Sequence, residues 1–192
     1  MARTIDDIDW NASVREYDLP GVEHAAFDQI IEMDILDNDK SYAFTLGIVV
    51  SFFTQAQETF DAMDKALLKA SPDEIKKTVS SDDAEALSEA QAQAETSALA
   101  ELSSLGHYLK GSSATLGVTT VKDGCEKIQL YGKMIGDNGA PEDDRNKCLV
   151  NIKTKLDEIR QEYQDVEAAL RRFFKMEPED AADGSINDEA VS

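Results

Sequence analysis

The sequence contains few of the residues that build metal centres, disulfide frameworks or membrane spans. Its 192 residues include two cysteines, Cys125 and Cys148, and two histidines, His24 and His107. The cysteines lie far apart and match no metal-ligand spacing, so we expect two reduced, partly buried thiols. An N-terminal apolar segment and an apolar run of about 18 residues are also lacking. These absences predict a soluble, intracellular protein.

Basic residues are scarce as well. The chain has 19 Lys and Arg against 39 Asp and Glu, which gives a formal net charge of −20. An acidic protein of this kind is repelled by phosphate backbones and by anionic lipid headgroups. We therefore expect neither a nucleic-acid partner nor a membrane partner, whereas a partner with a basic surface would be attracted.

Helical periodicity, in contrast, runs through most of the chain. Apolar residues recur at steps of three and four in about 22–33, 41–68, 98–116 and 119–135, and in a last segment after Pro141. The last segment has the most regular seam, formed by Leu149, Ile152, Leu156, Ile159, Tyr163, Val166, Leu170 and Phe173. No strand pattern competes. We predict an all-α fold, an antiparallel up-down four-helix bundle with a short additional N-terminal helix laid across one end.

The bundle domain is expected to cover residues 21–176. Residues 1–20 form an N-terminal extension, from which Ile5, Ile8 and Trp10 could pack against the bundle. Within the domain, residues 72–94 are polar, acidic and rich in alanine, so we interpret them as a linker whose later part extends the following helix. Residues 177–192 have acidic but no basic side chains. This composition predicts a disordered acidic tail.

His107 has an unusual local setting. On a helical wheel it lies about 180° from the middle of an apolar stripe that is formed by Ala98, Leu102, Leu105, Leu109 and Leu116. The outer-face neighbours expected around it are Ala100, Ser103, Ser104, Lys110, Gly111 and Ala114. Only Lys110 among these has a long side chain, so we expect the imidazole to be surrounded by small residues and accessible to a large partner. This pattern indicates a histidine that a large partner reaches and phosphorylates.

Two further observations bear on this interpretation. Gly111 costs a helix interior about 1 kcal/mol relative to alanine, so close approach by a partner is the natural reason for it. His24 stands near Glu23 and Asp28, and a solvated helix face explains it better than a metal site. Phosphate loops, GxSxG, HExxH and EF-hand spacings do not occur in the sequence.

The residues around His107 resemble the signature of the histidine-containing phosphotransfer (HPt) family, the carriers of multistep phosphorelays. The likeness rests on the run His107-Tyr108-Leu109-Lys110-Gly111-Ser112-Ser113-Ala114 followed by Leu116-Gly117. It continues at Cys125-Glu126-Lys127-Ile128-Gln129, Glu32-Met33-Asp34 and Phe53-Thr54-Gln55-Ala56-Gln57, and so covers most of 30–133. Within the family, the chain resembles in particular the fungal intermediates of osmosensing pathways.

The resemblance implies a function and a role for several residues. His107 would accept a phosphoryl group from the phospho-aspartate of one receiver domain and pass it to the aspartate of another. Lys110 would neutralise the phosphoryl charge, and Gly111 would give the receiver room. Gln129, with a smaller part for Ser112, would orient the imidazole. The partners would be receiver domains of a hybrid sensor histidine kinase and of response regulators, and the receiver would supply Mg²⁺, with no metal or cofactor belonging to this chain.

The resemblance also implies a largely apolar docking surface beside the histidine. The matching positions are Ile30, Met33, Phe44 and Ile48, with Gln55 at the edge and Lys133 one turn beyond Gln129. For Ile30 and Phe44, ordinary core packing is an equal alternative. We further expect a monomer that is present in cytoplasm and nucleus.

Two other functions share parts of this pattern. A helical adaptor could bind receiver or other signalling domains through its bundle without carrying phosphate. The phospho-acceptor domain of a histidine kinase would need an acidic residue directly after the histidine, where Tyr108 stands, together with glycine-rich ATP-binding boxes. The sequence therefore favours a phosphoryl carrier without ATP-dependent kinase activity of its own.

Overall fold

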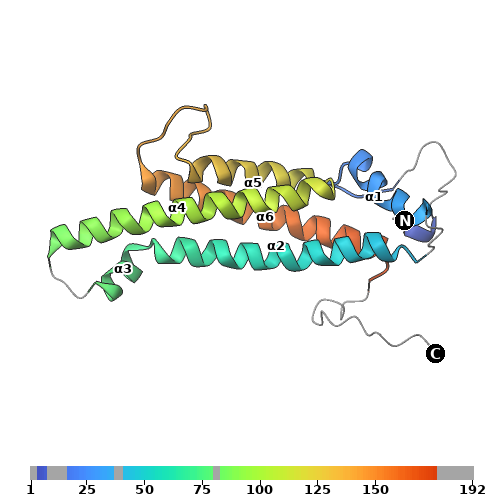
Figure 1. Cartoon of the computed structure of the whole chain (residues 1–192), viewed down its shortest axis with the longest axis horizontal. Helices are drawn as coiled ribbons and strands as arrows, with labels where there is room; N and C mark the ends of the chain where they lie inside the picture. Colours follow the sequence, from blue (N-terminus) through green and yellow to red (C-terminus); the bar gives the residue numbers. More distant parts are fainter. Residues whose placement is uncertain (1–3, 8–16, 37–40, 80–82, 177–192) are drawn as a thin grey trace.

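The computed structural model describes residues 4–7, 17–36, 41–79 and 83–176, and most of these are helical (Figure 1). A 3-10 turn at Ile5–Asp7 precedes α1 (His24–Leu36), α2 (Ala43–Lys69), α3 (Pro72–Thr78), α4 (Ala84–Thr115), α5 (Thr119–Gly132) and α6 (Arg145–Phe173). Across these described ranges the only β pairing consists of the isolated bridges Val22–Val118 and Ile135–Pro141. The predicted all-α class is confirmed.

Four long helices form the body of the molecule. In Figure 1, α2, α4, α5 and α6 lie side by side and each runs opposite to the one before it. Helix α4 packs against α2, α5 and α6, while α1 lies at the end where α2 begins and contacts α2 and α4. This is the predicted up-down bundle with a short N-terminal helix across one end.

The bundle core is built from one face of each long helix. Every residue of the seam predicted on the last helix is buried: Leu149, Ile152, Leu156, Ile159, Tyr163, Val166, Leu170 and Phe173. Phe60 and Met63 of α2 and Leu102 and Leu109 of α4 face the same interior. Each such side chain contributes about 1.5–3 kcal/mol by leaving water, so the amphipathic pattern is sufficient to set these faces inward.

The segment 72–94 is only partly as predicted: a linker is wrong for its first part, whereas its later part extends the following helix, as expected. It contains α3 and the first turns of α4. Pro72 occupies the first turn of α3, where its missing N–H is no loss, and the hydroxyl of Ser71 accepts from the Glu74 N–H. Asp83 caps α4 by accepting from the Glu85 N–H at 3.0 Å. Because Ala, Glu and Gln are strong helix formers, this stretch becomes helical although it buries little apolar surface.

The N-terminal extension contributes to the core where it is described. Ile5, Tyr17 and Leu19 are buried, so the expected packing of Ile5 is confirmed. Ile8, Trp10 and the predicted tail 177–192 lie outside the described residues. None of the helices described is both long and apolar enough to cross a membrane.

The joint between α1 and α2 depends on a buried carboxylate. The residue before α2, Tyr42, has a left-handed backbone with φ of 54° and provides no side-chain cap. Asp34 of α1 supplies the cap instead, accepting from the backbone N–H of Phe44 at 3.0 Å and of Thr45 at 2.9 Å, and from the Thr45 hydroxyl. The carboxylate therefore ties α1 to the positive end of α2.

A short turn fixes the relation between α4 and α5. Gly117 has φ of +73°, and a Cβ there would lie 2.7 Å from the Glu23 carbonyl oxygen. The Gly117 carbonyl in turn accepts from the Glu23 N–H at 2.7 Å. Only glycine satisfies both the left-handed backbone and this close approach, so the turn places α5 antiparallel to α4 with α1 beside it.

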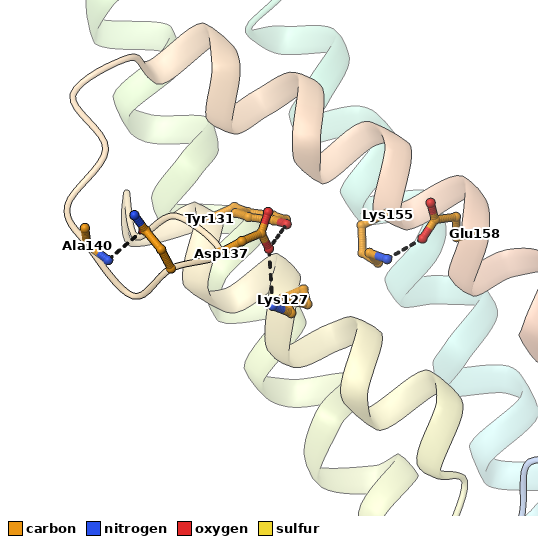
Figure 2. Close-up of polar contacts among 7 residues, drawn as sticks. Lys127, Tyr131, Asp137, Ala140, Lys155 and Glu158 are labelled. Carbon is orange, nitrogen blue, oxygen red and sulfur yellow. Dashed lines mark hydrogen bonds and ion pairs between the residues drawn. The ribbon is translucent and has the colours of Figure 1, made fainter.

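A polar network closes the connection from α5 to α6 (Figure 2). Asp137 accepts from the Tyr131 hydroxyl at 2.6 Å and from Lys127 at 3.2 Å. Burial and the hydrogen bond to Asp137 raise the pKa of Tyr131 to about 12. Lys155 and Glu158 pair on α6 nearby. The Asp137 contacts hold this loop against α5, at the opposite end of α5 from the Gly117 turn.

Candidate functional site

His107 lies on the exposed side of α4, as the helical wheel predicts. Its side chain is exposed, while Ala98, Leu102, Leu109 and Leu116 of the opposite stripe are buried and Leu105 is partly buried. The imidazole therefore faces solvent from the outer surface of the bundle, on a rigid helix in the middle of the chain.

For one neighbour of His107, the prediction of which face of α4 it lies on was wrong. Ser103 was expected on the outer surface, but it is buried at 8% exposure, and its hydroxyl donates to the Gln129 carbonyl at 3.2 Å. The neighbours Ala100, Ser104, Gly111 and Ala114 are exposed, as expected. The reason for the difference is that α5 lies close against α4 on this side, closer than packing through the leucine stripe alone would predict.

Glycines allow that close approach. A Cβ on Gly106 would lie 3.0 Å from the Cys125 carbonyl oxygen and 3.1 Å from the Gln129 nitrogen. A Cβ on Gly132 would lie 2.7 Å from the Leu99 carbonyl oxygen. The backbones of α4 and α5 are therefore in near contact directly behind His107, which brings α5 side chains into reach of the imidazole.

A matched pair of glycine variants tests this packing. Gly132→Ala is expected to lower the free energy of unfolding by about 1–3 kcal/mol, because its Cβ meets backbone that cannot yield unless the helices separate. Gly111→Ala is expected to raise it by about 0.5–1 kcal/mol, since a Cβ there has nothing within 4 Å. Urea denaturation followed by circular dichroism measures both. Shifts of the same sign in the two variants would contradict the close approach.

Gln129 is the α5 residue that reaches the histidine. Its side-chain nitrogen lies 3.3 Å from His107 Nδ1. The amide can present either its NH₂ group or its oxygen to this ring nitrogen, since the two orientations differ by a half turn. Nε2 is the ring nitrogen that this contact leaves available. Gln129 therefore contacts the imidazole, and its role in orienting the ring stays a prediction.

Lys110 and Ser112 differ in how they relate to the site. Lys110, one turn after His107, extends toward α5 and pairs with Glu126, its Nζ lying 3.8 Å from the carboxylate. Ser112 donates its hydroxyl to the Leu109 carbonyl at 3.2 Å within α4. The hydroxyl is therefore engaged with its own helix and not with the imidazole, contrary to the expectation for Ser112.

The two cysteines and His24 are the remaining candidate groups. Cys125 and Cys148 are free and buried, and burial raises the pKa of the Cys125 thiol to about 12. His24 is exposed beside the Tyr17 ring, with 4.3 Å between ring centroids. No group of three or more His, Cys, Asp or Glu side chains suited to a metal ion occurs in the described part of the chain.

The surface around His107 is open. Gly111 is exposed and has no heavy atom within 4 Å of the position of a Cβ. A cavity of about 300 Å³ lies elsewhere, under the loop between α5 and α6, and is lined among others by Tyr131, Asp137 and Cys148. Small ligands bind in hollows, whereas an exposed imidazole on an open helix face is suited to the surface of another protein.

Comparison with known proteins identifies the family. Residues 47–169, from the first turns of α2 into the last turns of α6, match the Hpt domain. The chain belongs to the Hpt domain family. The match includes the described site on α4 and α5.

Named relatives of this Hpt chain come from fungi. It is 32% identical over 155 residues to multistep phosphorelay regulator 1 of Schizosaccharomyces pombe, covering 80% of this chain and 42% of the relative. It is 33% identical over 136 residues to the phosphorelay intermediate protein YPD1 of Candida albicans, covering 71% of this chain and 53% of the relative. The chain thus spans about half the length, or less, of the curated relatives it matches.

Solved Hpt structures share the fold. Saccharomyces cerevisiae Ypd1, crystallised with the receiver domain of its downstream response regulator Ssk1, superposes with a TM-score of 0.56 at 26% identity, covering 82% of this chain and 98% of that one. A crystal structure of yeast Ypd1p gives a TM-score of 0.56 at 25% identity, over 82% of this chain and 96% of that one.

The predicted docking residues of this Hpt bundle are not equally accessible. Met33 and Phe44 are exposed at 52% and 47%, and Lys133 is also exposed. Ile48 and Gln55 are partly buried. Ile30 is buried at 8% within the core, so for this residue the packing alternative is the correct one. The exposed members of the predicted surface lie on α1, at the start of α2 and just after α5.

Sequence reasoning missed three contributors to the site. Gly106 and Gly132 set the spacing between α4 and α5, and Glu126 pairs with Lys110. A signal for Glu126 was present, because it precedes Gln129 by three residues and so lies on the same face of α5. The glycines gave no such signal, since their role depends on which helix lies behind them.

Proposed function

We propose that the chain is a phosphorelay intermediate, in which His107 accepts a phosphoryl group from the phospho-aspartate of one receiver domain and transfers it to the aspartate of a second. The observation that carries this proposal is the exposed His107 imidazole, held at Nδ1 by Gln129 with Lys110 one turn away. Relatives named as phosphorelay intermediates, and a Ypd1 structure with a receiver domain, support it.

The Gln129 contact at Nδ1 leaves Nε2 as the ring nitrogen that can react. If Gln129 presents its amide oxygen, that oxygen accepts a hydrogen bond from Nδ1–H, and the free lone pair of the neutral ring is then on Nε2. Nε2 then attacks the phosphorus atom, and the bond between phosphorus and the aspartyl oxygen breaks with its electron pair returning to the carboxylate. Onward transfer reverses these steps with a second aspartate as the acceptor.

Charge neutralisation is the second requirement. The transferred group carries negative charge on its oxygens throughout, and transfer depends mainly on positioning and electrostatic stabilisation. Lys110 projects from the same helix face one turn after His107 and has no covalent role to play. By the likeness to the family, we propose that the receiver domain supplies the divalent metal, Mg²⁺.

A single phospho-acceptor means that the two receiver domains bind one after the other. Because His107 is the one histidine placed for transfer, donor and acceptor receivers must occupy the same surface in turn. The exposed residues Met33, Phe44 and Lys133 are the proposed contacts, with Gly111 leaving room beside the imidazole. We propose that the chain acts as a monomer, in cytoplasm and nucleus.

Transfer of label from a receiver tests the proposal. The purified chain is mixed with a receiver domain phosphorylated on aspartate with ³²P, and we expect label on the chain that is acid-labile and alkali-stable, as phosphohistidine is. Addition of a second, unlabelled receiver should then remove the label. Binding of a receiver without uptake of label would support the adaptor alternative and contradict the proposal.

Lys110→Ala is expected to slow transfer and to shorten the lifetime of the phosphohistidine by about tenfold, the size of effect expected for one charge-assisted contact to a phosphoryl oxygen. The fold should be unaffected, because the side chain points away from the buried stripe. Time courses of label loss measure the effect. Lys69→Ala is the matched control, since Lys69 also pairs with a glutamate of a neighbouring helix, Glu101, at 3.3 Å. A normal lifetime in Lys110→Ala would refute the electrostatic role.

A further inference from the structure

We propose that Glu126 is a counter-charge that makes the phosphoryl group on His107 easier to pass on, by holding Lys110 when His107 is free and repelling the phosphoryl group when it is bound. The inference rests on the proposed function, because it concerns the lifetime of the phosphorylated state. It assigns a role to a residue that touches neither the imidazole nor the phosphoryl group.

The register of α4 against α5 places Glu126 at the site. His107 faces Gln129, and three residues further along α4 Lys110 faces Glu126, three residues back along α5. This is the relation expected of antiparallel neighbours. Residues three apart lie on one face of a helix, separated by about 4.5 Å along its axis. The carboxylate is therefore on the same face as the amide that contacts the imidazole.

The contact between Lys110 and Glu126 is loose enough to be exchanged. The two groups are 3.8 Å apart, and the Glu126 side chain is 56% exposed. The Lys110 side chain is 28% exposed, so much of its stem is covered by its neighbours. A pair of this kind holds the lysine weakly.

Phosphorylation of His107 gives Lys110 a second negatively charged partner besides Glu126. A phosphoryl group on His107 adds about two negative charges one turn from Lys110, and the ammonium group is attracted to it. Glu126 then competes for Lys110 and also repels the phosphoryl group directly. Both effects raise the free energy of the phosphohistidine relative to a phospho-aspartate on a distant receiver, which favours onward transfer.

A purely anchoring role for Glu126 would have the opposite sign. If the carboxylate served to hold Lys110 in place for the phosphoryl group, removing it would weaken the lysine contact and shorten the lifetime of the phosphohistidine. The two roles are therefore separated by the direction of the effect and not only by its size.

Glu126→Gln distinguishes these roles, because it removes the charge and keeps the shape. The full chain is labelled from a phosphorylated receiver, and both the half-life of the label and its equilibrium distribution between chain and receiver are measured. We expect a half-life about three- to tenfold longer and a similar shift of label toward His107 at low salt, with the difference shrinking at about 1 M salt. Glu126→Asp should stay close to the wild-type values.

Glu74→Gln is the control for net charge, since Glu74 pairs with Lys77 on α3, far from α5. It should leave both quantities unchanged. An unchanged or shorter half-life in Glu126→Gln, with the wild-type chain labelled normally, overturns the counter-charge role alone. If the wild-type chain takes up no label, the proposed function itself fails, and this inference fails with it.

Discussion

Replacing His107 by glutamine is expected to reduce the uptake of label from a phosphorylated receiver to background. Glutamine is close to histidine in size and polarity and can still form a hydrogen bond with the Gln129 amide, which contacts Nδ1 of His107 in the wild-type chain, but its side chain has no nucleophilic nitrogen. Because His107 is exposed and lies opposite the buried stripe, the substitution removes no core contact. Helix content and the urea midpoint should therefore match those of the wild-type chain.

The second histidine provides the matched control. The sequence contains two histidines, and His24 is also exposed on a helix. His24→Gln should take up label as the wild type does. Uptake that persists in His107→Gln, or that disappears in His24→Gln, would place the phosphoryl group on another residue and remove the basis of the proposed function.

Asp34→Ala is expected to lower the free energy of unfolding by about 2–4 kcal/mol. Asp34 is 2% exposed, and its carboxylate accepts from two backbone N–H groups at the start of α2 and from the Thr45 hydroxyl. Alanine leaves these donors without the carboxylate, and a buried donor without a partner costs about 1–3 kcal/mol. The favourable interaction of a negative charge with the helix N-terminus is lost as well.

Urea denaturation followed by circular dichroism measures this loss as a lower midpoint at unchanged slope. Asp61→Ala serves as control, because Asp61 is an exposed carboxylate on α2 that accepts a hydrogen bond from Gln57 one turn earlier. We expect a change within about 0.5 kcal/mol there. Equal midpoints for the two variants would show that Asp34 does not tie α1 to α2. Since Met33 and Phe44 flank this joint, Asp34→Ala should also weaken receiver docking.

The linker predicted at 72–94 failed in its first part, where α3 forms, and this shows what apolar periodicity alone overlooks. The segment has few apolar residues to bury, and its polar composition was weighed more heavily than its helix-forming residues. The signals for helices were nevertheless present, with Ser71 and Pro72 before α3 and Asp83 before α4. Local capping and helix propensity made this region helical, so its helices could have been predicted from the sequence.

The docking role expected for Ile30 and the outer-face position expected for Ser103 were wrong for a different reason. Each lies near the boundary between a buried and an exposed helix face, where a wheel does not say how close the neighbouring helix comes. Both are 8% exposed. For Ser103 the cause is the near contact of the α4 and α5 backbones at Gly106 and Gly132, which no pattern within one helix reveals.

The sequence by itself determined α1 and the four long helices, most of the faces they bury and the outward direction of His107, because each follows from the spacing of residues along one helix. It also identified Lys110, Gly111 and Gln129 through the signature they share with the Hpt family. Only the tertiary structure decided that Gln129 meets Nδ1, that Glu126 pairs with Lys110 and that Asp34 caps α2. These contacts join different helices, and they depend on the register and spacing that packing alone establishes.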